Sequence, residues 1–131
     1  MAIDAAVLAD PESFMRLALE AAAASELAGD LPIGAVAVHQ GSVIATAGNR
    51  RAIDNDPTAH AEVLVLQAAA RSLGSWRLSD VTVVVTLGPC PMCAGALWAA
   101  RAGGVVFGAS DMKAGATGSL YNLGADPRLN H

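Results

Sequence analysis

Two short motifs hold the residues of this chain that are best suited to chemistry. The first is His60-Ala61-Glu62, and the second is Pro89-Cys90-Pro91-Met92-Cys93. Together they offer an imidazole, two thiols and a carboxylate. Catalytic zinc sites commonly take three protein ligands and leave a fourth position for water. The sequence therefore predicts one zinc ion held by His60, Cys90 and Cys93, with Glu62 as a carboxylate that does not bind the metal.

This set of side chains suits hydrolysis by a metal-activated water. Zinc lowers the pKa of a bound water from ~15.7 toward ~7, so that hydroxide is present at neutral pH. The proton movements of such a hydrolysis need a carboxylic group beside the water, and Glu62 is the predicted catalytic group. An H-x-E motif followed by P-C-x-x-C is the pattern of zinc-dependent nucleobase deaminases. The residues thus indicate an enzyme.

Three other interpretations of the same residues are open. Cys90 and Cys93 can form a redox pair of the thioredoxin type. A zinc ion can also be purely structural, with His39 or His131 as a fourth ligand. His60 can be an ordinary buried histidine. The presence of both motifs, each at the start of an expected helix, favours the catalytic zinc site.

Composition sets the frame for this chemistry. A chain of 131 residues is expected to form one domain. With two cysteines and no stretch of ~20 apolar residues, we expect a reducing, cytoplasmic setting and no membrane span. The apolar content of 53% suggests that a second subunit covers part of the surface. The net charge of −4 comes from the first 30 residues, and residues 31–131 hold seven basic and six acidic groups, so charge neither supports nor excludes RNA.

The order of helices and strands follows from hydrophobic periodicity and turn residues. The pattern predicts a helix from Asp10-Pro11-Glu12 to Gly29, and a later helix that Thr58 or Asp56 caps and Gly74 ends. The remaining expected elements are strands at 33–39, 43–47, 81–87 and 105–107, a helix at 91–101, a loop at 48–58, and a loop with a short helical piece after residue 110. This alternation predicts an α/β fold with a mixed sheet between helices.

Asn49 lies in the polar loop, and its side chain can have either of two roles. A side-chain amide can bond the edge of a base in a bidentate manner. Asparagine near the end of a strand is equally typical of a turn. The residues alone leave both open.

The sequence resembles the bacterial tRNA adenosine deaminases of the cytidine deaminase-like superfamily. The zinc motifs fit the whole superfamily, and residues 108–120 point to the tRNA branch. The resemblance is carried by residues 31–36 (LPIGAV), 48–50 (GNR), 56–62 (DPTAHAE), 89–96 (PCPMCAGA) and 107–109 (FGA), with Asp111, Lys113, 118–120 (GSL) and 130–131 (NH).

The resemblance implies a three-layer α/β/α cytidine deaminase-like fold with a central mixed β-sheet. It implies hydrolytic deamination of adenosine to inosine at the wobble position of tRNA, by a cytoplasmic homodimer that binds the anticodon arm. It also implies substrate-binding residues: Asn49 as a contact to the flipped nucleoside, Pro32, Ile33 and Leu87 as pocket walls, Ala61 as a further contact, and Asp111 near the neighbouring nucleotide.

The sequence also departs from the family pattern at single positions. Gly88 stands where the family usually has glutamate, and Ser110 where arginine is frequent. We expect a single deaminase domain over residues 1–131 without the family's C-terminal helix. Two alternative functions stay open. The motif at 90–93 (CPMC) and the weak basic character favour a deaminase of free guanine or cytosine, whereas Gly88 and the expected short C-terminus favour a zinc-bound domain with little activity.

Overall fold

The computed structural model describes residues 3–109, which form an α/β arrangement of four helices and four strands. The elements expected between Asp10 and residue 107 are all present. The helices are α1 (Ala5–Ala9), α2 (Pro11–Leu27), α3 (Ala61–Leu73) and α4 (Pro91–Ala99), and the strands are β1 (Gly34–His39), β2 (Ser42–Gly48), β3 (Val81–Leu87) and β4 (Gly104–Ala109).

The strands form one mixed sheet in the order β2-β1-β3-β4. β1 pairs in antiparallel fashion with both β2 and β3, while β3 and β4 are parallel and are joined through α4. A tight turn at Gln40 and Gly41, both with positive φ, connects β1 to β2. The predicted hairpin and the predicted mixed sheet are both confirmed.

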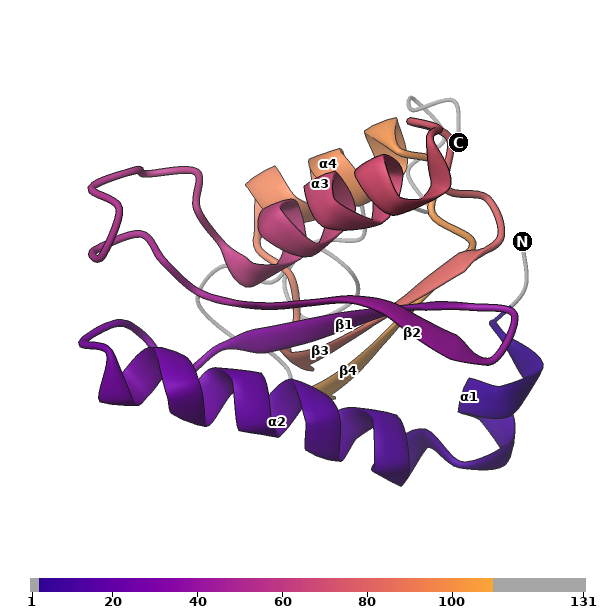
Figure 1. Cartoon of the computed structure of the whole chain (residues 1–131), viewed down its shortest axis with the longest axis horizontal. Coiled ribbons are helices and arrows are strands. Elements are labelled where there is room, and N and C mark those ends of the chain that lie inside the picture. Colours follow the sequence, from indigo (N-terminus) through magenta and orange to yellow (C-terminus); the bar gives the residue numbers. More distant parts are fainter. Residues whose placement is uncertain (1–2, 110–131) are drawn as a thin grey trace.

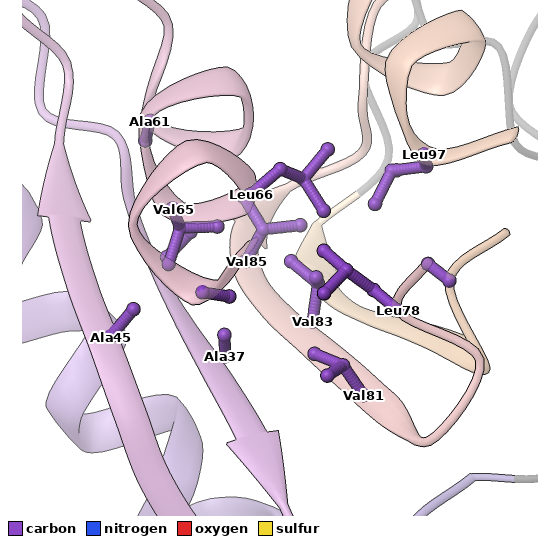
Figure 2. Packing of buried hydrophobic residues seen from close by; sticks show 13 residues of the cluster. Ala37, Ala45, Ala61, Val65, Leu66, Leu78, Val81, Val83, Val85 and Leu97 are labelled. Carbon is purple, nitrogen blue, oxygen red and sulfur yellow. The ribbon is translucent and has the colours of Figure 1, made fainter. Parts of the chain in front are cut away.

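Helices cover both faces of this sheet. Figure 1 shows α1 and α2 on one face and α3 with α4 on the other. β3 serves both layers, because Val81, Val83 and Val85 belong to the core under α3 and α4, whereas Val84 belongs to the core on the α1 and α2 side. Figure 2 shows the first of these cores, where Val65 of α3 lies over the sheet. The predicted three-layer α/β/α fold is confirmed.

Two glycines let α2 lie directly against the hairpin. A Cβ atom on Gly34 would lie 2.0 Å from the carbonyl oxygen of Ala18, and one on Gly48 would lie 2.0 Å from Ser25 Oγ. Only glycine fits such an approach of a helix to a strand. The close packing brings the end of α2 beside the start of β1 and the end of β2.

Local details differ from the sequence expectations. α1 was not predicted; its five residues are too few to show a periodic pattern. The expected cap of α3 is wrong: the N-cap is His60, without a side-chain capping bond, and Asp56 instead accepts hydrogen bonds from the N–H and the hydroxyl of Thr58. α4 ends before residue 101 because Arg101 takes a positive φ of 57°.

The predicted tail after Ser110 lies outside the described residues. Within residues 3–109, no helix is long and apolar enough to cross a membrane.

Candidate metal centre and active site

Two helix N-termini meet at the site. His60 is the N-cap of α3 and Cys90 is the N-cap of α4, with Pro91 in its first turn. Cys93 lies one turn further and is fully buried. Free N–H groups and the helix dipole make such positions favourable for thiolates. The predicted placement of the cysteines at the start of a helix is therefore confirmed.

The ligand atoms have the spacing of a zinc site. His60 Nδ1 lies 3.7 Å from Cys90 Sγ and 3.4 Å from Cys93 Sγ. With Zn–S near 2.3 Å and Zn–N near 2.0 Å, tetrahedral geometry puts nitrogen and sulfur roughly 3.6 Å apart. The three ligand atoms all lie within 4.8 Å of one another, and among the described residues this is the one group of metal-ligating side chains. The donor set fits zinc, and His39 does not join it.

The pKa values of the two thiols are shifted in opposite directions. The hydrogen bond from Cys93, together with backbone N–H groups and His60, lowers the pKa of Cys90 to about 5 despite partial burial. The same bond to Cys90, with burial, raises the pKa of Cys93 above its usual range. One thiolate is thus favoured before any cation binds, and a bound dication makes both sulfurs thiolates.

Glu62 lies in the first turn of α3 and is only 4% exposed. Burial raises the pKa of its carboxyl, while its own N–H, Cys93 and His60 act in the opposite direction. Glu62 does not belong to the ligand group. A carboxyl beside a metal centre, with a raised pKa and no bond to the metal, is suited to accepting and returning protons.

The predicted substrate residues on the sheet lie at this same end of the molecule. Asn49 directly follows β2 and is 2% exposed, and its N–H donates to the carbonyl of Ile33 at 2.9 Å. Because Ala35 pairs with Val85, the residues just before β1 lie level with the end of β3, where Leu87 is half-buried. The fold therefore brings Asn49, Ile33 and Leu87 to one edge of the sheet, and Pro32 lies exposed beside them.

Three other residues named from the sequence stand differently. Ala61 is fully buried in the core, and its N–H lies in the first turn of α3, where N–H groups have no partner within the helix. Gly88 is buried between β3 and Pro89. Asp111 lies outside the described residues.

One polar residue of this region was missed by the sequence analysis. Asp30 lies in the loop between α2 and β1, and its carboxylate accepts a hydrogen bond from Asn49 Nδ2 at 2.7 Å. The available signal was an acidic residue directly before the Leu31-Pro32-Ile33 segment.

The fold and the His-Cys-Cys centre with its buried glutamate define a zinc-binding deaminase domain. Residues 8–109 match the family model described as the cytidine and deoxycytidylate deaminase zinc-binding region. The tRNA-specific adenosine deaminase of Bacillus subtilis is 48% identical to this chain over 120 residues, which cover 92% of this chain and 74% of that protein. The chain belongs to the family of tRNA-specific adenosine deaminases, and its cofactor is zinc.

Solved structures agree with this assignment. One, from biochemical and structural studies of A-to-I editing by tRNA deaminases at the wobble position, is similar with a TM-score of 0.89 and 43% identity, covering 93% of this chain and 94% of that one. The guanine deaminase of Bacillus subtilis is similar with a TM-score of 0.73 and 40% identity, covering 76% of this chain and 64% of that one. The predicted family and fold are thereby confirmed.

Proposed function

We propose that this protein hydrolyses adenosine to inosine at the wobble position of a tRNA anticodon. The observation that carries the proposal is the 48% identity to a tRNA-specific adenosine deaminase over 92% of the chain, combined with an intact ligand group and a buried Glu62. A zinc ion at three protein ligands supplies a Lewis acid and a bound water of lowered pKa.

The chain's own residues move the protons of this reaction. Glu62, with its raised pKa, accepts the first proton of the attacking water and gives it to the ring nitrogen. It then accepts the second proton from the hydroxyl group formed on the reacting carbon and gives it to the amine, which leaves as ammonia. Its burial keeps bulk water from competing for those protons. Glu62 is therefore the proposed catalytic residue, and His60, Cys90 and Cys93 are the proposed metal ligands.

The edge of the sheet forms the proposed base pocket. Ile33, Leu87 and Pro32 offer apolar walls, and Asn49 offers the amide that contacts the nucleoside. The N–H of Ala61 lies in the first turn of α3, so it has no partner within the helix and can donate to the nucleoside. A duplexed or stacked base cannot reach such a site, so the target adenosine is splayed out of the anticodon loop. Asp111 is proposed to contact the neighbouring nucleotide on the family pattern alone.

A second candidate function is deamination of a free base. It is favoured by the similarity to guanine deaminase at 40% identity. The metal ligands and Glu62 serve either reaction, because the chemistry at the reacting carbon is the same.

The test is a direct comparison of substrates. The zinc-loaded protein is incubated with an anticodon stem-loop that carries a wobble adenosine, and in parallel with guanine and with cytosine. Inosine in the stem-loop, with no conversion of the free bases, is the expected result. Deamination of a free base alone would replace the proposal with the second candidate, and the variant Glu62→Gln gives the background in each assay.

We further propose that the protein acts as a homodimer in the cytoplasm, where tRNA is its partner. An apolar groove of about 330 Å³ between α3 and α4 supports the dimer. Trp76 lines this groove and is 65% exposed. A large exposed aromatic side chain on an apolar surface is typical of a protein interface.

A further inference from the structure

The backbone of Asn49 is held from two sides. Its N–H donates to the carbonyl of Ile33 at 2.9 Å, and its carbonyl accepts a hydrogen bond from Ser25 Oγ at 2.9 Å. Ser25 belongs to α2, and Ile33 directly precedes β1. These two bonds fix the backbone of Asn49. They do not fix its side-chain rotamer or the direction of its amide, which need a contact to the side chain itself.

The carboxylate of Asp30 is the group in contact with that amide. Asp30 Oδ1 accepts from Asn49 Nδ2 at 2.7 Å and from the N–H of Leu31 at 2.8 Å. Asp30 Oδ2 accepts from the N–H groups of Ala52 and Ile53, at 2.8 and 3.0 Å. Both oxygens therefore accept from donors of two segments of the chain, the residue directly after Asp30 and the loop at 49–53.

The ionised state of Asp30 decides how the amide faces. Although partial desolvation opposes it, the bonds from Ile53, Leu31, Asn49 and Ala52 hold the pKa of Asp30 at about 2. An ionised carboxylate only accepts hydrogen bonds, so it must meet the NH2 group of Asn49 and not the carbonyl. Within residues 3–109, Asn49 Oδ1 and the second N–H of its amide then have no hydrogen-bond partner, and they form the acceptor and donor pair that reads a base edge.

Asp30 itself stands apart from the metal ligands. The loop after Asn49 is tied to the metal motif through the N–H of Arg50, which donates to the carbonyl of Ala59 at 2.9 Å, directly before His60. Asp30 bonds to Asn49 and to the backbone of residues 31, 52 and 53, and not to a metal ligand. Any effect of Asp30 on the reaction therefore passes through Asn49 or through the loop.

We propose that Asp30 is a positioning residue that fixes the rotamer and the amide direction of Asn49, so that the carbonyl and one N–H of Asn49 meet the substrate nucleoside. The inference rests on the proposed function, because it assigns Asn49 to the substrate. Asp30 acts on the reaction without touching the base.

The first test replaces the carboxylate by an isosteric amide. In Asp30→Asn, the new NH2 group either faces backbone N–H donors and repels them, or faces Asn49 and makes the amide of Asn49 flip. In both cases the carbonyl and N–H of Asn49 no longer point at the nucleoside as they do in the native protein. Misplacing a substrate-orienting group costs about tenfold to hundredfold in rate. We expect a loss of that size in kcat/KM on the wobble-adenosine stem-loop. The matched control is Glu26→Gln, which removes one negative charge from the exposed last turn of α2 and is expected to change nothing.

A double-mutant cycle distinguishes positioning from a general structural role. Asp30→Asn is introduced into both the native chain and Asn49→Ala, and kcat/KM is measured for the four proteins. If Asp30 acts through Asn49, its replacement has no further effect once the Asn49 amide is absent. An equal loss in both backgrounds would show that Asp30 acts independently of Asn49, and would overturn the inference.

A spectroscopic readout tests the geometry without any substrate. The side-chain amide resonances of Asn49 are identified in ¹H–¹⁵N spectra of the zinc-loaded protein by their loss in Asn49→Ala. They are expected to shift in Asp30→Asn and to stay in place in Glu26→Gln. Unchanged Asn49 resonances in Asp30→Asn would overturn the inference even in an active enzyme. Failure of the native protein to convert the stem-loop would instead refute the proposed function, and the amide resonances would still decide whether Asp30 orients Asn49.

Discussion

The positions of two neighbouring side chains distinguish a metal ligand from the proton-transfer group. His60 and Glu62 are two positions apart at the start of α3, yet only His60 lies within the ligand group. Glu62 is instead buried, and its pKa is raised. The sequence predicted this division from helical geometry. It could not reveal the burial of Glu62, which depends on how α3 packs on the sheet.

Replacing Glu62 separates catalysis from metal binding. Glu62→Gln keeps the size of the side chain and removes its ability to exchange protons. We expect kcat on the stem-loop to fall by roughly 10²- to 10⁴-fold. Zinc content, measured by atomic absorption, should remain near one ion per chain. Turnover at the native rate would remove Glu62 from the mechanism.

Replacing Cys90 has the opposite signature. Cys90→Ser removes one of three protein ligands and the sulfur whose pKa is lowered to about 5. We expect zinc to be lost on dialysis and activity to disappear with it, because soft thiolate ligands hold zinc at such sites. The variant Met92→Leu, in the same turn but outside the ligand group, serves as the control. Full zinc retention in Cys90→Ser would contradict the assigned ligand set.

At the scale of elements, the positions of the helices depend on contacts that patterning does not reveal. The sequence predicted α2, the hairpin and β3 because their periodicity and turn residues are strong. It failed at the N-cap of α3, where the side chain of His60 is turned toward the two sulfurs instead of capping the helix. Tertiary demands at a functional site override the local capping preference there.

The contact of α2 with β1 predicts a sensitive glycine. In Gly34→Ala the new Cβ would meet the backbone of Ala18 and Ala22 at 2.0 and 2.5 Å, so α2 must move away from the sheet. We expect a loss of about 1–3 kcal/mol in the free energy of unfolding, as for other overpacked cores. Gly95→Ala in α4 is the control, since its Cβ meets nothing within 4 Å, and it should gain about 0.5–1 kcal/mol. Chemical denaturation measures both, and equal stabilities of the two variants would contradict the close packing.

The loop between α2 and β1 predicts a dependence of stability on pH. Asp30 has a folded-state pKa of about 2, below its value of ~3.9 in an unfolded chain. A depressed pKa stabilises the fold above the unfolded value, and this contribution is lost as the pH falls toward the folded value. We expect the difference in Tm between the native protein and Asp30→Asn to be largest above about pH 5 and to shrink toward about pH 2. Thermal melts of both proteins at matched pH measure it, and a constant difference would contradict the role of the charge.

At the scale of the whole molecule, the structure shows two outer faces that could bind a second subunit. The apolar content of 53% led to the expectation of a second subunit without naming a surface. The fold places the two candidate surfaces on opposite faces of the sheet. The groove between α3 and α4 with Trp76 lies on one face of the sheet, and the exposed Leu27 ends α2 on the other. Periodicity places apolar residues on a helix face, but it cannot say which face is covered by another chain.

The groove lined by Trp76 is therefore the surface on which the proposed homodimer can be tested. Trp76→Glu places a charge on this apolar surface, and an interface tryptophan typically contributes at least about 2 kcal/mol, or roughly a thirtyfold change in Kd. We expect sedimentation velocity to show a dimer for the native protein and a shift to monomer for Trp76→Glu. Leu27→Glu, at a side chain that is 91% exposed on the opposite face, is expected to remain a dimer. Dissociation by Leu27→Glu but not by Trp76→Glu would move the interface to α2, and a monomeric native protein would remove the homodimer altogether.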